Sequence, residues 1–314
     1  MRAARLRTWA QRQLPCGARI VALLGALTLL AVPLAACTQP TAATATQQPR
    51  TFYITGIPDQ DVSVMEKTFT GMASYLSRKT GLKVEYVPSA DYAAVVTSFK
   101  NGDVQLGWYG GLTGVQARLA VKDAQVIAQR PRDETFHSVF VASPDSGIKS
   151  LADVKGRSLT FGSESSTSGH VMPRYYLLEA GVDPSKDIKG AANYSGSHDT
   201  TWKLVESGAF DVGALNEAVW EQREKAGEID KSKVDVFFRT PAFYDYHWII
   251  RPDVDARFGA GTKQKMTDAV LAMTASDPDQ KPVLDLFATD KFIPTNAENY
   301  AAIERVARNL KIIE

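Results

Sequence analysis

The amino-acid sequence predicts an α/β protein whose globular body forms two α/β lobes with a ligand cleft between them. Three observations lead to this prediction. Apolar runs of strand length alternate with segments of helical periodicity along most of the chain, a pattern typical of sheets that are covered by helices. About 265 residues lie beyond residue 50, which is room for one large or two medium domains. From 263 onward the chain is helical without matching strands, so these helices must cover a sheet that formed earlier.

The first 36 residues have the composition of an export signal. Five arginines and no acidic residue are followed by an apolar run over 20–36. The core of that run contains Gly25, Thr28 and Pro33 and is short for a permanent bilayer span. We therefore expect residues 1–36 to be a cleaved signal peptide.

The signal is expected to end at a lipidated cysteine. Leu34-Ala35-Ala36-Cys37 has the form of a bacterial lipoprotein box, so Cys37 is predicted to begin the mature chain and to carry a lipid on its thiol. An ordinary A-x-A cleavage that leaves Cys37 as a free thiol is the alternative. Residues 37–50 are polar and rich in Thr, Ala and Gln, which predicts a flexible tether. The protein is expected outside the cytoplasm, facing the periplasm or another extracytoplasmic space, with only its lipid in the membrane.

Charge and cysteine content exclude some classes of protein. Removal of residues 1–36 leaves 31 basic against 35 acidic residues, so nucleic-acid binding has no electrostatic support. Cys16 lies in the signal and Cys37 at the tether, and these are the chain's two cysteines. The body therefore has no disulfide, and its stability must come from burial of a core.

The strands and helices of the body are expected in regular alternation. Apolar runs that end at Gly, Pro or Asn predict strands at 52–58, 83–88, 104–109, 124–129, 137–142, 158–161, 191–194, 212–215 and 234–239. Apolar residues at helical spacing predict helices at 62–78, 92–100, 169–180, 202–208, 218–225, 263–276, 282–287 and 296–310. Because strands alternate with helices, we expect parallel sheets.

The order of these elements divides the body into three segments. Residues 51–140 are expected to build the first part of lobe 1, residues 141–240 to build lobe 2, and residues 241–314 to return to lobe 1. Ligands of open α/β sheets bind at the carboxyl ends of the strands, and two lobes joined by paired crossovers form a cleft there.

The sequence FGSESSTSGH at 161–170 is the strongest candidate for a ligand site. It lies at the end of a predicted strand and the start of a predicted helix, where unpaired N–H groups and the helix dipole favour an anion. Ser165, Ser166, Thr167 and Ser168 add four hydroxyl donors, and Gly169 leaves room for a ligand to approach the backbone. This pattern predicts a site for a tetrahedral oxyanion held by neutral donors. The alternative is that these residues only cap the helix.

Several longer stretches resemble one known family. SSTSG followed by MPRYYLLEAG, with NGDVQLGWYGG upstream and YSGSHDTTWKLVESGAFDVGALNEAVW downstream, is similar to the periplasmic solute-binding lipoproteins of phosphonate-type ABC transporters. The resemblance covers about 52–310 and implies a bilobal periplasmic-binding-protein fold of type II. GIPDQDVSVMEK, QRPRDETFHSVF and YDYHWIIRPD resemble the selenate-transporter branch, with phosphonate and phosphite binders as neighbouring branches.

The resemblance implies roles for particular residues. In the family the helix-start hydroxyls donate to the oxyanion, a role that falls here on Ser166, Thr167 and Ser168. A histidine that contacts the anion matches His198 in SGSHD, for which a capping role is the alternative.

Further residues are expected to line the cleft. The resemblance places Trp108 and Tyr109 there, and Tyr92 could reach it from the start of a helix. Glu217 and Asp245 lie near the acids that hold the ammonium of aminophosphonates, but the surrounding YDYHW departs from the phosphonate pattern. That departure favours an inorganic ligand.

The sequence therefore predicts a binding protein that captures a small oxyanion and delivers it to an ABC permease and its ATPase. Selenate is the leading ligand, and phosphite or phosphonate is the alternative, since a monoprotonated anion needs an acceptor that Glu164, Glu217 or Asp245 could supply. We expect a monomer with no catalytic residue, no metal and no cofactor. A hydrolase using Ser166, His198 and Asp199, and a sensor subunit for a membrane receptor, are the other hypotheses.

Overall fold

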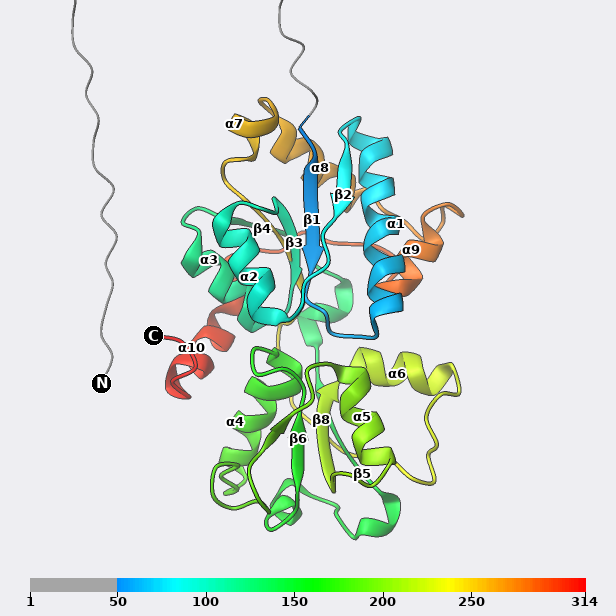
Figure 1. Cartoon of the computed structure of the whole chain (residues 1–314), viewed down its shortest axis with the longest axis vertical. Coiled ribbons are helices and arrows are strands. Elements are labelled where there is room, and N and C mark those ends of the chain that lie inside the picture. Colours follow the sequence, from blue (N-terminus) through cyan, green and yellow to red (C-terminus); the bar gives the residue numbers. More distant parts are fainter. Residues whose placement is uncertain (1–49) are drawn as a thin grey trace, which may run out of the picture. The chain divides into compact units, whose positions relative to one another are not determined.

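Residues 50–314 are described by the structure, a computed structural model, and they build two five-stranded sheets flanked by helices (Figure 1). We call the parts built on the first and second sheets lobe 1 and lobe 2. The two-lobed α/β fold is confirmed. The signal peptide, Cys37 and nearly all of the tether lie outside the described residues. Within 50–314, no helix combines the length and apolar character needed to cross a bilayer.

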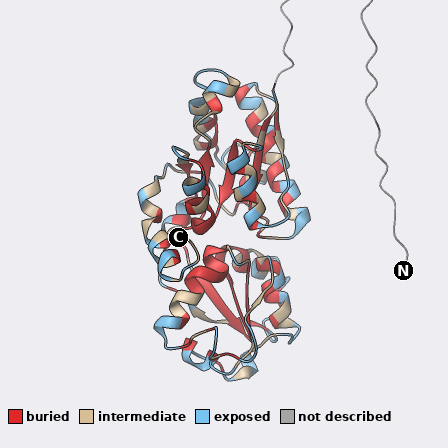
Figure 2. Cartoon of the chain, turned by 60° about the vertical axis from the view of Figure 1, so that its left-hand side comes forward, coloured by how far each residue is buried: buried red, intermediate tan, exposed pale blue. Residues whose placement is uncertain are grey.

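Lobe 1 contains the sheet with strand order β2-β1-β3-β10-β4. Its strands are β1 (Phe52–Gly56), β2 (Val84–Tyr86), β3 (Leu106–Tyr109), β4 (Gln125–Ala128) and β10 (His247–Ile250). Its helices are α1 (Val62–Thr80), α2 (Tyr92–Asn101), α3 (Gly111–Ala120), α7 (Val254–Phe258), α8 (Thr262–Leu271), α9 (Lys281–Leu286) and α10 (Ala301–Asn309). The residues of the strands between these helices are mostly buried (Figure 2).

Lobe 2 contains the sheet with strand order β7-β6-β8-β5-β9. Its strands are β5 (Ser138–Ala142), β6 (Leu159–Phe161), β7 (Asn193–Tyr194), β8 (Val212–Asn216) and β9 (Asp235–Arg239). Its helices are α4 (Met172–Glu179), α5 (His198–Glu206) and α6 (Glu217–Lys225). Apolar clusters on the two faces of this sheet form its core.

The expectation of parallel sheets is wrong, because both sheets are mixed. Strand β10 is antiparallel to β3 and β4, and β5 is antiparallel to β8 and β9. Each of these strands is the first that the chain forms after crossing between lobes, so no α-helix of the lobe it enters lies between the crossover and the strand. The HWII sequence of β10 is fully buried between two strands. Hydrophobic periodicity reports that burial but not the direction of the strand.

Helix α1 shows how local sequence sets the edges of the cleft. Asp61 is its N-cap, and Gly81 ends it in the left-handed conformation with an N–H bond to the Ser77 carbonyl. The buried face includes Met72 and Phe69, whose ring stacks on Tyr86. This packing holds the start of α1 at the carboxyl end of β1, facing lobe 2.

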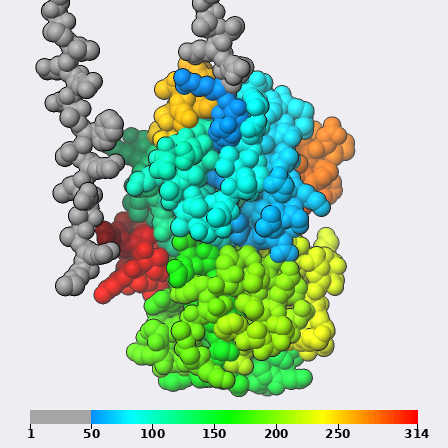
Figure 3. All heavy atoms as spheres, viewed as in Figure 1, coloured from blue at the N-terminus to red at the C-terminus, as the bar shows by residue number. Residues whose placement is uncertain are grey.

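Two crossovers connect the lobes and run side by side. The chain leaves lobe 1 after β4 and returns after β9, and the two segments form a pair of backbone hydrogen bonds between Phe136 and Phe243, both 2.9 Å long. The division at 140 and 240 expected from the sequence stays a prediction. In Figure 3 the surfaces of the two lobes meet on the face that is shown.

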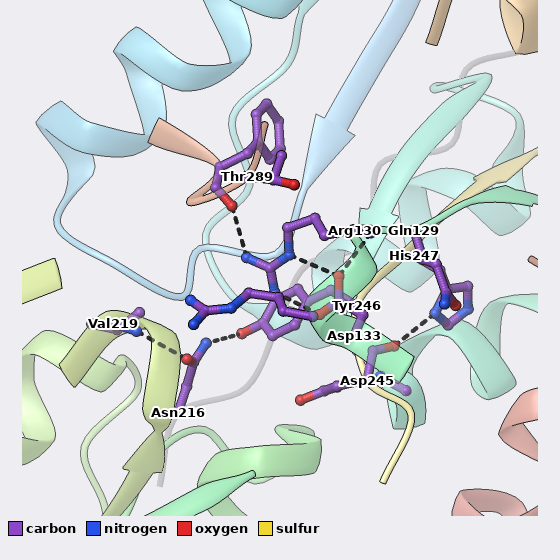
Figure 4. Close-up of polar contacts among 12 residues, drawn as sticks. Gln129, Arg130, Asp133, Asn216, Val219, Asp245, Tyr246, His247 and Thr289 are labelled. Atoms are coloured by element: carbon purple, nitrogen blue, oxygen red, sulfur yellow. Dashed lines mark hydrogen bonds and ion pairs between the residues drawn. The ribbon is translucent and has the colours of Figure 1, made fainter. Parts of the chain in front are cut away.

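A buried ion pair anchors the first crossover. The Arg130 guanidinium donates to both carboxylate oxygens of Asp133, at 2.7 and 2.6 Å, and to the Phe287 carbonyl at 2.9 Å. Its plane also lies against the rings of Trp108 and Tyr246. The pair thereby ties the crossover to the core of lobe 1 (Figure 4).

Candidate functional site

The hydroxyl-rich stretch lies where β6 ends and the next helix begins. Ser166 is the N-cap, and its Oγ accepts a hydrogen bond of 2.9 Å from the Gly169 N–H. The turn that follows, Thr167–Val171, is a wide π-helical turn, and α4 begins only at Met172. Ser166, Thr167 and Ser168 are all buried. Capping therefore uses one hydroxyl and leaves the others for contacts across the cleft.

The other two hydroxyls of this stretch have different surroundings. The Thr167 Oγ1 accepts a 2.8 Å hydrogen bond from the N–H of Leu112, at the start of α3 in lobe 1. The Ser168 Oγ is buried and has no hydrogen-bond partner within the described residues. One hydroxyl thus joins the lobes, and the next is an unused donor at their interface.

Gly169 permits the close approach of His198. A Cβ at this position would lie 2.9 Å from the His198 Cε1 and 2.9 Å from the Ser166 Oγ, which is closer than real Cβ contacts. The glycine therefore lets the imidazole of lobe 2 pack directly on the turn that carries the hydroxyls.

His198, the first residue of α5, is fully buried and neutral. Burial lowers its pKa from 6.5 to about 4. The Asn216 N–H donates to its Nδ1 at 3.3 Å, so the proton resides on Nε2, which lies 3.4 Å from the Tyr246 hydroxyl. His198 is thus a neutral imidazole with one N–H, which faces the Tyr246 hydroxyl, and its contact with an anion stays a prediction.

Asp245 brings a carboxyl group to the same place. Its Oδ1 accepts the N–H of Gly111 at 2.8 Å, whereas its Oδ2 is buried without a hydrogen-bond partner in the described part of the chain. Burial raises the pKa of Asp245 to about 7, although the Gly111 N–H and the hydroxyls of Ser168 and Thr167 oppose this shift. Near neutral pH this carboxyl exists in both protonation states.

Tyr92 completes a group of three unused polar atoms. Its hydroxyl is buried and, among residues 50–314, has no hydrogen-bond partner. Burial and the nearby Asp59 carboxyl raise its pKa well above 10, and the Ser166 hydroxyl and Asp245 also act on it. Buried polar atoms are seldom left unpaired. The Tyr92 hydroxyl, Ser168 Oγ and Asp245 Oδ2 are thus three buried polar atoms that, within residues 50–314, form no hydrogen bond of normal geometry, although Ser168 lies near Asp245 and Ser166 near Tyr92.

The sequence analysis missed a second layer of residues that supports this group. The Tyr246 hydroxyl donates to Asp59 Oδ2 at 2.8 Å. It accepts from Asn216 Nδ2 at 2.8 Å (Figure 4). Burial raises the pKa of Asp59 to about 6. Asp59 follows β1 and Asn216 ends β8, and a polar residue at the carboxyl end of a strand is a signal that could have identified both.

Three residues expected in the cleft have further roles. The Trp108 ring stacks on Tyr246 at 5.6 Å between centroids and belongs to the lobe 1 core, and it also lines a small cavity with Asp59 and Asn216. The Tyr109 side chain folds back along β3 toward Gly107. A Cβ on that glycine would lie only 2.6 Å from the Tyr109 hydroxyl. The Glu217 carboxylate forms an ion pair with Arg239 of β9 within lobe 2.

The residues of the hydrolase hypothesis are not arranged as a catalytic triad. Within the described residues no hydrogen bond joins Ser166 to His198, and the His198 Nδ1 accepts from the Asn216 N–H instead of donating to a carboxylate. The Asp199 carboxylate is held by Arg223. In the same part of the chain, no three His, Cys, Asp or Glu side chains are grouped as metal ligands.

Comparison with known proteins gives a consistent family. The family model described as the periplasmic substrate-binding protein of phosphonate ABC transporters matches residues 54–300. A probable phosphite-binding protein of an ABC transporter from Prochlorococcus marinus is 41% identical over 272 residues, which cover 84% of this chain and 91% of the relative. The phosphonates-binding periplasmic protein of Escherichia coli is 25% identical over 228 residues, covering 70% and 65%.

Solved structures agree with this result. The Prochlorococcus marinus protein PhnD1 in complex with methylphosphonate has a TM-score of 0.82 and 41% identity, and the match covers 84% of this chain and 100% of that one. The fold is thus the type II fold of periplasmic binding proteins. The comparisons do not support the selenate branch that the sequence analysis favoured, and they agree better with its phosphite and phosphonate alternative.

Proposed function

This chain belongs to the family of periplasmic substrate-binding proteins of phosphonate-type ABC transporters, and from this premise we propose that its ligand is phosphite or a small phosphonate such as methylphosphonate. The protein is a binding component and not an enzyme. Family membership implies export to the periplasm and a membrane permease with its ATPase as partners. The identity of the ligand is argued from the site.

The unpartnered Oδ2 of Asp245 is the observation that carries the proposal. A carboxyl oxygen and an anion oxygen repel each other unless one proton lies between them. Phosphoryl groups bound through a single ester link lose their second proton near pH 6, so phosphorus oxyanions supply or accept a proton near neutral pH. Selenate and sulfate carry no proton there. Asp245 therefore favours a phosphorus oxyanion.

Neutral donors supply the remaining contacts of the proposed complex. We assign these to the hydroxyls of Ser166, Thr167, Ser168 and Tyr92 and to the Nε2–H of His198, all of which belong to buried residues. Hydrogen bonds to an ionised acceptor are roughly twice as strong as neutral ones. Because the donors come from both lobes, the bound anion stabilises the closed arrangement.

The surroundings of Glu217 support a ligand without an ammonium group. Its carboxylate is paired with Arg239, so it is not free to hold a cation of the ligand. The adjacent Asn216 is neutral and donates to Tyr246. A compact anion with an apolar hydrogen or methyl substituent fits this arrangement better than an aminophosphonate.

Calorimetry on the purified protein lacking residues 1–36 tests the proposed ligand. We expect phosphite or methylphosphonate to bind more tightly than selenate or sulfate, because a phosphorus oxyanion can share a proton with either protonation state of Asp245, whereas selenate and sulfate pair only with the protonated carboxyl. Comparable affinity for all four anions would refute the role of Asp245. If none of the four anions gives a heat of binding, the oxyanion site is refuted altogether.

The affinity for phosphite should depend on pH with a maximum. The complex holds one proton between Asp245 and the ligand. Below about pH 6 the free protein and the free ligand each carry a proton, so binding must release one of the two. Above the Asp245 pKa of about 7 neither partner carries one, and binding must take up a proton. We therefore expect affinity to peak between these values and to fall about tenfold per pH unit above them. Titrations from pH 5 to 9 check this, and a flat profile would contradict it.

The membrane attachment proposed for Cys37 has a separate test. We propose that the thiol of Cys37 is diacylated and that residues 38–50 tether the body to the membrane. In bacterial cells, the wild-type protein should incorporate a fatty-acid label and shift in mobility with globomycin, and Cys37→Ala should do neither. A label that persists in the variant would rule out this cysteine as the anchor.

A further inference from the structure

A second set of contacts between the lobes lies next to the proposed anion site. His198 and Asp199 open helix α5 of lobe 2, and both reach the segment of lobe 1 that leads into α1. The His198 N–H donates to the Asp59 carbonyl at 2.9 Å. The Asp61 N–H donates to the Asp199 Oδ2, also at 2.9 Å. Two consecutive residues of lobe 2 thus bond the backbone of lobe 1 at Asp59 and at Asp61.

The Asp199 carboxylate is held rigidly for this contact. It is fully buried, and the Arg223 guanidinium donates to its two oxygens at 2.7 and 2.8 Å. The Trp202 indole N–H lies 3.3 Å from its Oδ1. Burial alone would raise the pKa of Asp199, but the hydrogen bonds from Arg223 and from the Asp61 N–H outweigh burial and lower it. The group is therefore an ionised acceptor in a fixed position.

The partner of this carboxylate is the start of a long helix. Asp61 is the N-cap of the 19-residue α1, and its own side chain makes no capping bond. A negative charge is favourable at a helix N-terminus. No side chain of lobe 1 caps α1 at Asp61, and the Asp199 carboxylate of lobe 2 instead bonds the backbone at the start of this helix. The Asp61 side chain instead pairs with Lys203 at the exposed edge, a contact of the kind that contributes little.

We propose that Asp199 is a positioning residue that couples ligand capture to lobe closure, because it follows His198 at the start of α5 and bonds the Asp61 N–H when the lobes meet. This inference rests on the proposed function, because it concerns the affinity for the same anion. Asp199 does not contact the ligand. Separation of the lobes breaks its bond to Asp61, so the bond adds to the stability of the closed state alone and slows release of the ligand.

Asp61→Pro removes the donor and places a ring carbon where the hydrogen now faces the Asp199 carboxylate. The φ angle of Asp61 is −59°, close to the value that proline requires, and proline is well tolerated at the start of a helix. Asp61→Ala is the matched variant, because it also loses the carboxylate and the Lys203 pair but keeps the N–H. The difference between the two variants therefore measures the loss of the contact between the Asp61 backbone and Asp199.

We expect Asp61→Pro to bind phosphite or methylphosphonate at least tenfold more weakly than Asp61→Ala, with the difference in the dissociation rate measured by stopped flow. Small-angle scattering at saturating ligand should show a larger open fraction for the proline variant. The thermal unfolding of the two ligand-free variants should agree, since the bond is absent from the open form. A purely structural role would change the unfolding temperature and not the release rate.

Equal dissociation rates for the two variants would overturn the coupling proposal while leaving the ligand proposal intact. Failure of the wild-type protein to bind any phosphorus oxyanion would instead refute the proposed function. If the proline variant does not fold, Asp199→Ala replaces it, since it removes the oxygen that accepts the Asp61 N–H. A ligand dissociation rate in that variant equal to the wild-type rate would also overturn the proposal.

Discussion

Asp245→Asn is expected to weaken phosphite binding by up to about 100-fold below pH 6, where the anion carries its second proton, and to remove the preference for phosphite over selenate. The amide keeps an oxygen for the Gly111 N–H but places an NH₂ donor where the unpartnered Oδ2 now lies. A protonated anion then meets a donor with its own O–H, whereas a fully ionised anion gains a partner. Leaving a buried charged or polar group unpaired costs on the order of 2–3 kcal/mol, which corresponds to this change in affinity.

Calorimetric titration of wild type and variant with both anions measures both changes. The variant should also lose the fall in affinity above pH 7, because its amide does not titrate. Glu164→Gln is the matched control, since it removes the same charge from an exposed carboxylate two residues before Ser166. Unchanged anion selectivity in Asp245→Asn would show that Asp245 does not face the ligand. A change in Glu164→Gln would identify that residue as the acceptor instead.

Asp133→Asn is expected to have the largest effect on stability, a loss of about 3–5 kcal/mol. The Asp133 carboxylate is fully buried and is the partner of the buried Arg130 guanidinium. Removing one charge of a buried pair leaves the other uncompensated in an apolar environment. At roughly 2–4 °C per kcal/mol for a protein of this size, the unfolding temperature should fall by about 10 °C.

Thermal and denaturant unfolding of the ligand-free protein check this expectation. Asp285→Asn is the control, because it breaks an ion pair with Lys281 in which both side chains are about half exposed, and it should change stability by less than about 0.5 kcal/mol. The Asp133 variant should also bind ligand more weakly, since the Asp133 carbonyl accepts the Asp245 N–H and thereby positions the return crossover. Equal unfolding temperatures for the two variants would contradict the importance of the buried pair.

Much of the local structure could be predicted because it depends on neighbours in the chain. The helix at 62–78 and the strand at 52–58 are found within two residues at each end, since apolar spacing and a terminating glycine act over a few residues. The hydroxyl stretch at 166–168 was recognised for the same reason. Helix α3 was missed, because its first residues, GLTG, have two glycines and little helical propensity. The side chains of Asp245 and Thr167 bind its first N–H groups from outside.

The sequence by itself determined the α/β class, the two lobes, and the turn that presents Ser166, Thr167 and Ser168. Only the tertiary structure decided that β10 enters its sheet antiparallel, that Tyr109 turns away from the cleft, and that Tyr246 reaches Asp59 across 187 positions of the chain. The reason is physical. Periodicity and capping act over one or two turns and report which residues are buried, whereas the partner of a buried polar group is set by how distant segments pack.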